Sequence, residues 1–162
     1  MVFASQTGNA EDVAELLGAE AALRHFSPRV VSSEACDLGT LAGARLLVCV
    51  VATAGQVRPA QRVRPPSLCL CLRQRTQGDP PDSFVRLWRS LLRKSLPPTA
   101  LAHCRCAVFG LGDSGYPKFN VMAKKLDRRL EALGAAKLVP LGLGDDQARG
   151  CEGRGAPFRL PS

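Results

Sequence analysis

The chain has 162 residues, enough for one domain with a substantial hydrophobic core. Hydrophobic residues make up 46% of it and charged residues 22%, as in globular proteins, and the longest apolar run, Leu46–Ala52, is far too short to cross a membrane. Because the first residues lead directly into a loop that suits phosphate binding, we expect no signal peptide. We therefore expect a cytoplasmic protein that does not insert into membranes.

The net charge of +8 does not predict nucleic-acid binding, because the excess positive charge lies in two segments. Residues 57–77 contain five arginines and no acidic residue, and residues 148–162 contain three arginines against one glutamate. The rest of the chain is nearly neutral. The seven cysteines form no CxxC pair and no cysteine–histidine spacing typical of zinc, so we expect reduced thiols and no metal site.

The amino-terminal segment suits phosphate binding. Ser5–Ala10 (SQTGNA) lies between a short apolar strand, Met1–Ala4, and a predicted helix, Glu11–Arg24. The apolar residues of this helix fall on one face at helical spacing: Val13, Leu16, Leu17 and Ala21. Free backbone N–H groups, the helix dipole and small hydroxyl residues together favour an anion. The alternative, that Thr7 or Asn9 merely caps the helix, remains open at this point.

Strands and helices alternate along the rest of the chain. The pattern predicts strands over residues 29–32, 45–53, 104–109 and 137–141, and helices over residues 82–95 and 118–133. The second helix would face the core with Met122, Leu126, Leu130 and Leu133 and end at Gly134. This order predicts an α/β fold with a parallel five-stranded sheet, in which ligands bind beyond the carboxyl ends of the strands.

A glycine-rich segment, Gly110–Asn120, follows the fourth predicted strand. It contains GxGxxG, but a dinucleotide fingerprint normally follows the first strand of such a sheet. Tyr116 offers an aromatic face and Asn120 an amide, so a flat ring system could stack here while its phosphate binds at Ser5–Ala10. A Rossmann-type NAD(P) enzyme built on Gly110–Gly115 is the alternative interpretation.

Five motifs carry a resemblance to a known family. They occur in the order SQTGNAEDVAE, VVATAGQ, GDPPDSF, GLGDSGYPKFN and LGDDQ. In this order they resemble the FMN domain of the NADPH-dependent diflavin oxidoreductase family, which is similar to cytochrome P450 reductase. The resemblance covers residues 2–56 and 78–147. It implies a flavodoxin-like, doubly wound fold with one bound FMN and no catalytic side chain, because the flavin does the chemistry.

The same resemblance implies which residues hold the cofactor. The phosphate is assigned to Ser5, Gln6, Thr7, Gly8, Asn9 and Ala10. One edge of the ring is assigned to Ala52, Thr53, Ala54 and Gly55. The other side is assigned to Leu111, Gly112, Asp113, Ser114, Gly115, Tyr116, Pro117, Lys118, Phe119 and Asn120, with Asp146 nearby. Tyr116 would stack on the ring.

The resemblance also implies a role in electron transfer. The full-length family protein passes electrons from NADPH through FAD to FMN and on to an iron–sulfur assembly partner in the cytoplasm. We expect an acidic rim around the exposed flavin edge that docks basic partners. Its members would be Asp79, Asp82, Asp113, Asp145 and Asp146.

The chain departs from the family pattern in four places. Its first strand, Met1–Ala4, is short, and Thr53-Ala54-Gly55-Gln56 lacks one hydroxyl that the family has near the flavin. Residues 57–77 interrupt the family-like domain 1–147, and residues 148–162 show no helical pattern where the last helix would stand. We expect the FAD and NADPH modules and this last helix to be missing.

The composition of residues 57–77 suggests a retained intron read in frame, which would form an irregular excursion beside the flavin site. Because the chain departs from the family pattern in these places, a further interpretation is that it is a splice product that binds no cofactor. Titration with FMN separates that alternative from an electron-carrier domain.

Overall fold

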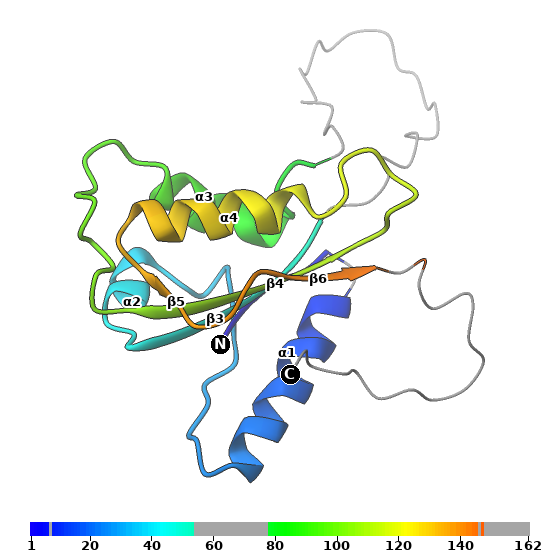
Figure 1. Ribbon diagram of the computed structural model, residues 1–162, viewed down its shortest axis with the longest axis horizontal. Coiled ribbons are helices and arrows are strands. Elements are labelled where there is room, and N and C mark those ends of the chain that lie inside the picture. Colours follow the sequence, from blue (N-terminus) through cyan, green and yellow to red (C-terminus); the bar gives the residue numbers. More distant parts are fainter. Residues whose placement is uncertain (7, 54–77, 146, 148–162) are drawn as a thin grey trace, which may run out of the picture.

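The computed structural model describes residues 1–6, 8–53, 78–145 and 147 (Figure 1). The expectations about residues 57–77 and 148–162, including the missing last helix, fall outside these residues. Within the described part of the chain, none of the helices is both long enough and apolar enough to span a membrane.

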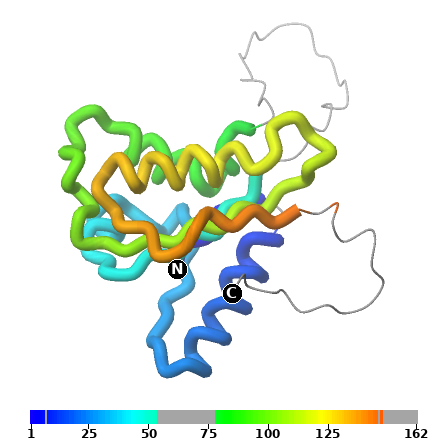
Figure 2. Tube along the Cα trace, viewed as in Figure 1, coloured from blue at the N-terminus to red at the C-terminus, as the bar shows by residue number. Residues whose placement is uncertain are grey.

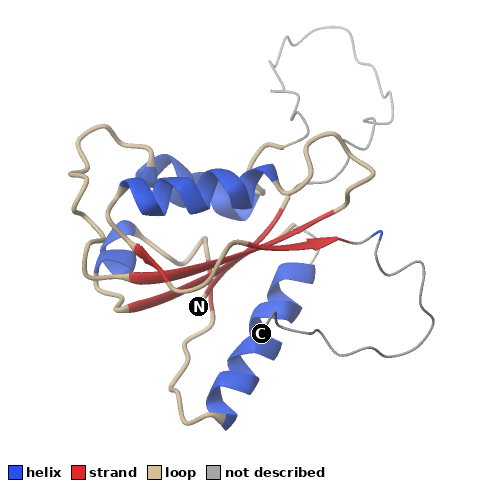
Figure 3. Cartoon of the chain, viewed as in Figure 1, coloured by secondary structure: helices blue, strands red, loops and turns tan. Residues whose placement is uncertain are grey.

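A parallel sheet forms the centre of the molecule (Figure 3). Its strands are β1 (Val2–Ala4), β2 (Val31–Ser32), β3 (Leu46–Ala52), β4 (Arg105–Gly112), β5 (Ala136–Lys137) and β6 (Gly142–Asp145). The order is β2-β1-β3-β4-β5, and β6 also pairs with β4. The short first strand lies inside the sheet, with Val2 opposite Val31 on one side and Cys49 on the other. The predicted parallel α/β fold is confirmed.

Two short strands, β5 and β6, share the fifth position of the sheet beside β4. The prediction of one strand over residues 137–141 is wrong, because residues 138–141 lie between the two strands. Pro140 lies in this gap, and proline has no N–H to donate to a neighbouring strand. A Cβ on Gly142 would stand 2.5 Å from the Phe109 ring, so glycine allows β6 to approach β4 closely.

The helices cover both faces of the sheet. They are α1 (Asn9–Leu23), α2 (Leu38–Ala42), α3 (Asp82–Leu91) and α4 (Val121–Ala132). Figure 1 shows α1 on one face and α3 and α4 on the other. The sequence analysis missed α2, whose N-cap Asp37 accepts a hydrogen bond from the backbone N–H of Thr40 at 2.7 Å. Helix α3 ends at Leu91 rather than near residue 95, and Leu92 is 49% exposed.

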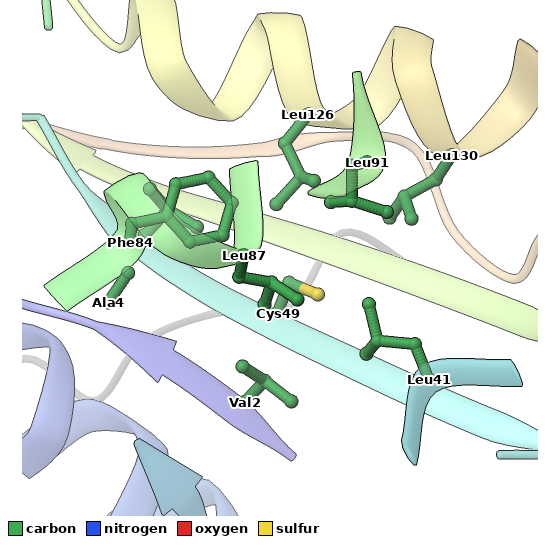
Figure 4. A pocket seen from close by; sticks show the side chains of 10 residues that line it. Val2, Ala4, Leu41, Cys49, Phe84, Leu87, Leu91, Leu126 and Leu130 are labelled. Carbon is green, nitrogen blue, oxygen red and sulfur yellow. The ribbon is translucent and has the colours of Figure 1, made fainter. Parts of the chain in front are cut away.

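The main hydrophobic core lies between the sheet and the layer of α3 and α4. The predicted core positions of α4 are buried, and Gly134 adopts a φ of 90° just after the helix. Figure 4 shows side chains from the strands and helices around an apolar cavity of about 10 Å³, the least space that holds one water. This cavity belongs to the packed core and offers no space for a cofactor.

Helix α1 packs mainly through small residues. Of the predicted apolar face, Val13 does pack against the core, whereas the prediction is wrong for the two leucines. Its buried residues are Ala10, Ala14 and Gly18, whereas Leu16 is 70% exposed and Leu17 is 36% exposed. A Cβ on Gly18 would stand 2.8 Å from Val30 Cγ2, so the helix lies too close to its neighbours for larger side chains. The leucines are therefore displaced from the contact.

Candidate functional site

Several loops meet at one edge of the sheet, beyond the carboxyl ends of the strands (Figure 2). The loop after β1 enters α1, Thr53 follows β3, and residues 113–120 connect β4 to α4. Asp145 ends β6 at the same edge. Because the paired strands are parallel, the predicted phosphate loop and the predicted ring loops are brought together as the sequence indicates.

Ser5 organises the turn into α1. Its Oγ accepts hydrogen bonds from the backbone N–H of Gly8 at 2.9 Å and of Ala10 at 3.3 Å. Gly8 is the N-cap residue in the left-handed conformation, and Asn9 is the first residue of the helix, without a side-chain capping bond. The capping alternative is therefore wrong for Asn9, while Thr7 lies outside the described residues. The Ser5 hydroxyl keeps its own proton to donate.

Two further serines hold this loop against α3. Ser83 Oγ donates to the carbonyl of Ser5 at 3.0 Å, and Ser33 Oγ donates to the carbonyl of Ser83 at 2.9 Å. Sequence reasoning did not identify either residue as part of the site. The only available signal for Ser83 was its place in the motif GDPPDSF. These bonds fix where the backbone of the phosphate loop stands.

Gly110 and Gly112, which were predicted to lie in the glycine-rich loop before α4 (here the second loop), have a packing role. Strand β4 extends to Gly112, so the loop begins at Asp113 and not at Gly110 as predicted. A Cβ on Gly110 would stand 2.6 Å from the Cβ of Ala123, and one on Gly112 would stand 2.8 Å from Asn120 Oδ1. The close approach of β4 to the start of α4 therefore requires these glycines, whatever the ligand.

Asn120 joins the second loop to the last strand. It is fully buried in the left-handed conformation (φ 52°), and its Nδ2 donates to the carbonyl of Gly144 at 2.9 Å. Its Oδ1 has no hydrogen-bond partner among the described residues. Asn120 thus positions the loop, and its predicted contact with the ring remains a prediction.

Carboxylates and Gln147 tie the second loop to the end of β6. Asp113 Oδ1 accepts from the N–H of Gly115 and from Gln147 Nε2, both at 2.8 Å. Asp145 Oδ1 accepts from the N–H of Ser114 at 2.9 Å and of Gln147 at 3.1 Å. The hydrogen bonds from Ser114 lower the pKa of Asp145 below its ordinary value. Sequence reasoning missed Gln147, although it ends the motif LGDDQ.

The remaining residues of this loop are more open to solvent. Tyr116 and Phe119 are half-buried, while Pro117 and Lys118 are exposed. Lys124 Nζ lies 5.3 Å from the centre of the Phe119 ring and donates to the Phe119 carbonyl at 3.1 Å. The proposed stacking of Tyr116 on a ring is neither supported nor opposed by these contacts.

Two polar side-chain atoms are buried near this edge. Thr53 Oγ1 and Asn120 Oδ1 lie at the ends of the loops without hydrogen-bond partners among the described residues. Leaving such an atom unpaired costs about 1–3 kcal/mol. The Thr53 N–H donates to the carbonyl of Leu111 at 2.9 Å, which holds the loop after β3 beside β4. Ala54, Gly55 and Asp146 lie outside the described residues.

The described residues hold no group of three histidine, cysteine, aspartate or glutamate side chains that could bind a metal ion. Cys36, Cys49, Cys104 and Cys106 are free and buried, as expected of reduced thiols. Burial raises the pKa of each of these thiols. The polar loop ends therefore remain the best-supported site in the described part of the molecule.

Comparison with known proteins shows which family shares this sequence pattern. The chain matches the family described as Flavodoxin over residues 1–74 and 68–154. It is 43% identical to NADPH-dependent diflavin oxidoreductase 1 of Danio rerio over 147 residues, which is 91% of the chain and 21% of that relative. It is 44% identical to the protein of that name from Arabidopsis thaliana over 162 residues, which is 99% of the chain and 23% of that relative. The chain thus spans about a fifth of the length of these relatives.

A solved structure shows the same fold. The flavodoxin of Streptococcus pneumonia TIGR4 superposes with a TM-score of 0.67 at 22% identity, covering 89% of this chain and 81% of that one.

Proposed function

The chain belongs to the flavodoxin family, and we propose that it is an FMN-binding electron-transfer domain. FMN is the cofactor of this family. The observation that carries the proposal is the meeting of the Ser5 loop, Thr53 and the loop from Asp113 to Phe119 at the carboxyl ends of adjacent parallel strands. A ligand that combines a phosphate with a flat polar ring would fit this arrangement.

The phosphate would bind at the turn into α1. The positive end of the helix dipole favours an anion there, and Gly8, in the left-handed conformation, has no atom within 4 Å of a Cβ placed on it. The Ser5 hydroxyl has accepted two N–H groups and can donate its proton to a phosphate oxygen. The bonds from Ser83 and Ser33 keep this loop from shifting when the anion enters.

The ring would lie between Thr53 and the loop from Asp113 to Phe119. When bound, FMN accepts and donates one or two electrons. The side chains of the chain itself bind and orient it: the hydrogen bonds of Asp113 and Asp145 hold the second loop in place. No nucleophile or general base is required for this role, so the protein acts through hydrogen bonds, stacking and nearby charge.

We further propose that the domain works within a longer cytoplasmic oxidoreductase. The named relatives are more than four times as long as this chain and carry a name that specifies two flavins and NADPH. In such a protein electrons would pass from NADPH through FAD to FMN and on to an iron–sulfur assembly partner. The acidic rim that docks this partner would consist of Asp79, Asp82, Asp113, Asp145 and Asp146.

Titration of the purified chain with FMN tests the proposal. We expect saturable quenching of flavin fluorescence. FAD and NADPH should bind more weakly in side-by-side calorimetry, because the proposal assigns phosphate binding to the Ser5 loop alone. Tighter binding of NADPH than of FMN would favour a nicotinamide enzyme. A folded chain that fails to quench FMN at any concentration would favour the splice product that binds no cofactor.

A further inference from the structure

The helices on the two faces of the sheet carry opposite charges. The exposed side chains of α1 include Glu11, Asp12, Glu15 and Glu20. Those of α3, α4 and the turn after α3 include Arg86, Arg89, Arg93, Lys125 and Arg128. Because α1 lies on one face of the sheet and α3 and α4 on the other (Figure 1), positive charge gathers on the α3–α4 side.

Three of these arginines line one open groove between α2 and α3. Arg86 and Arg89 lie on α3, and Arg93 follows the end of the helix. Their spacing of three and four residues places them in one row along the helix. At 1.5 Å per residue this row is about 10 Å long. All three side chains are exposed, so the row faces solvent along the groove.

The opposite wall of the groove neutralises this row only in part. Asp37 lines it, but its Oδ1 already accepts hydrogen bonds from the N–H and the hydroxyl of Thr40, at 2.7 Å each. These bonds, with a smaller contribution from the charge of Arg86, lower the pKa of Asp37. Arg89 and Arg93 form no ion pair with any other described residue. With Asp37 and Asp82 counted against the three arginines, the lining of the groove keeps a net positive charge.

Apolar side chains, Leu38 from α2 and Val85 from α3, lie beside the arginine row in the groove. We propose that the groove binds an acidic amphipathic segment of a partner protein. Carboxylates of this segment would meet the arginine row, and its apolar side chains would pack on Leu38 and Val85. Charge complementarity sets the class of partner, and the arginine forks favour carboxylates bound by paired hydrogen bonds.

A peptide fits this groove better than a nucleic acid does. No aromatic ring occurs among the described residues that line it, so bases would have nothing to stack on.

The arginine row of the groove lies away from the proposed flavin site, although Asp82, at the start of α3, belongs both to the groove lining and to the proposed acidic rim. Figure 1 shows α2 at the end of the sheet opposite to the carboxyl ends of β4 and β6. A segment bound between α2 and α3 would leave the Ser5 loop uncovered. The domain could therefore hold one protein at the groove while its flavin edge exchanges electrons with another.

Fluorescence anisotropy with the full chain tests the groove directly. The probe is a labelled helical peptide of about 15 residues with glutamates at positions i, i+3 and i+7 and leucines on the adjacent face. We expect saturable binding that weakens between about 50 and 200 mM salt. The variant Arg89→Glu/Arg93→Glu should weaken it at least about tenfold, a loss of about 1.4 kcal/mol. Its FMN affinity should stay unchanged.

The matched control is Lys125→Glu/Arg128→Glu, which changes the net charge equally but lies on α4 outside the lining of the groove. We expect it to weaken peptide binding less than about threefold. The milder pair Arg89→Gln/Arg93→Gln keeps the test valid if charge reversal prevents folding. Equal losses in the groove and control variants, absence of saturable binding, or tighter binding of a DNA duplex would each overturn the proposal. The proposal would also be overturned if the chain self-associates and the Arg89→Glu/Arg93→Glu variant abolishes this self-association, because the groove would then bind a second copy of the chain.

Discussion

Replacement of Ser5 by alanine separates two roles of one hydroxyl group. In the structure Ser5 Oγ accepts hydrogen bonds from the N–H of Gly8 at 2.9 Å and of Ala10 at 3.3 Å, and so shapes the turn into α1. In the proposed complex the proton of the same hydroxyl donates to the phosphate of FMN. The first role contributes to the stability of the free chain, whereas the second contributes only to cofactor affinity.

The two losses have different magnitudes. Removing a hydroxyl that caps a helix costs about 0.5–2 kcal/mol of unfolding free energy. In a domain of this size 1 kcal/mol corresponds to a shift in Tm of about 2–4 °C, so the free Ser5→Ala chain should melt a few degrees lower. A hydrogen bond to a charged group contributes about 1.5–3 kcal/mol. The Kd for FMN should therefore rise roughly tenfold to a hundredfold.

Thermal unfolding of the FMN-free chain gives the first quantity and quenching of flavin fluorescence gives the second. Ser5→Thr keeps the hydroxyl and should bind FMN within about threefold of the parent chain. Ser83→Ala removes only the 3.0 Å bond to the Ser5 carbonyl and controls for a general loosening of the loop. If Ser5→Ala melts lower but binds FMN as tightly as the parent, the hydroxyl is a helix cap only and its contact with the phosphate is refuted.

Three further predictions concern packing, pH and thiols. Gly110→Ala should destabilise the chain by about 1–3 kcal/mol in urea unfolding, because its Cβ would stand 2.6 Å from that of Ala123. Gly39→Ala is the control: the nearest atom to its Cβ would be 3.5 Å away, so it should destabilise the chain much less. The lowered pKa of Asp145 means that its carboxylate stabilises the fold fully above the ordinary value of 3.8 and loses this effect as pH falls through the lower folded value. The unfolding free energy of Asp145→Asn should therefore be lower than that of the parent near pH 6, and the two values should converge as the pH falls below the folded pKa of Asp145. A difference that stays constant with pH would contradict this. The four described cysteines, all buried, should resist a short alkylation pulse until denaturant is added, as peptide mapping by mass spectrometry can check.

The sequence pattern was sufficient for the order of strands and helices but not for the contact face of α1. Counting apolar residues favours Leu16 and Leu17, yet the structure buries Ala10, Ala14 and Gly18. The burial of this helix depends on how closely it can approach the sheet, and only small side chains allow that distance. Such a steric fit is a property of two elements together and cannot be read from the helix alone.

Helix α2 was missed for a different reason. Its five residues are too few to show a helical period. The only local signal was Asp37 three residues before Thr40, which is a capping pattern but also occurs in turns. Strand β4 was predicted to end too early because glycine usually indicates a loop, whereas Gly110 and Gly112 continue the strand to make room for α4.

The loops of the candidate site could be located from strand order, because parallel strands place their carboxyl ends together. The bonds that hold these loops could not be predicted locally. Asn120 and Gly144 are 24 residues apart, and Asp113 and Gln147 are 34 apart. Each pair depends on β6 lying beside β4, and β6 itself begins only after the strand pattern is broken at Pro140.

The dependence of the second loop on β6 has a consequence for function. Three of its anchors, Gly144, Asp145 and Gln147, belong to the last described segment of the domain. The predicted phosphate loop has a different anchor, Ser83, whose own carbonyl accepts a hydrogen bond from Ser33. Disturbing the end of the domain should therefore loosen the ring side of the site while leaving the phosphate side in place. Because the flavin potential depends on contacts to the ring, such a change would act on electron transfer before it acts on retention of the cofactor.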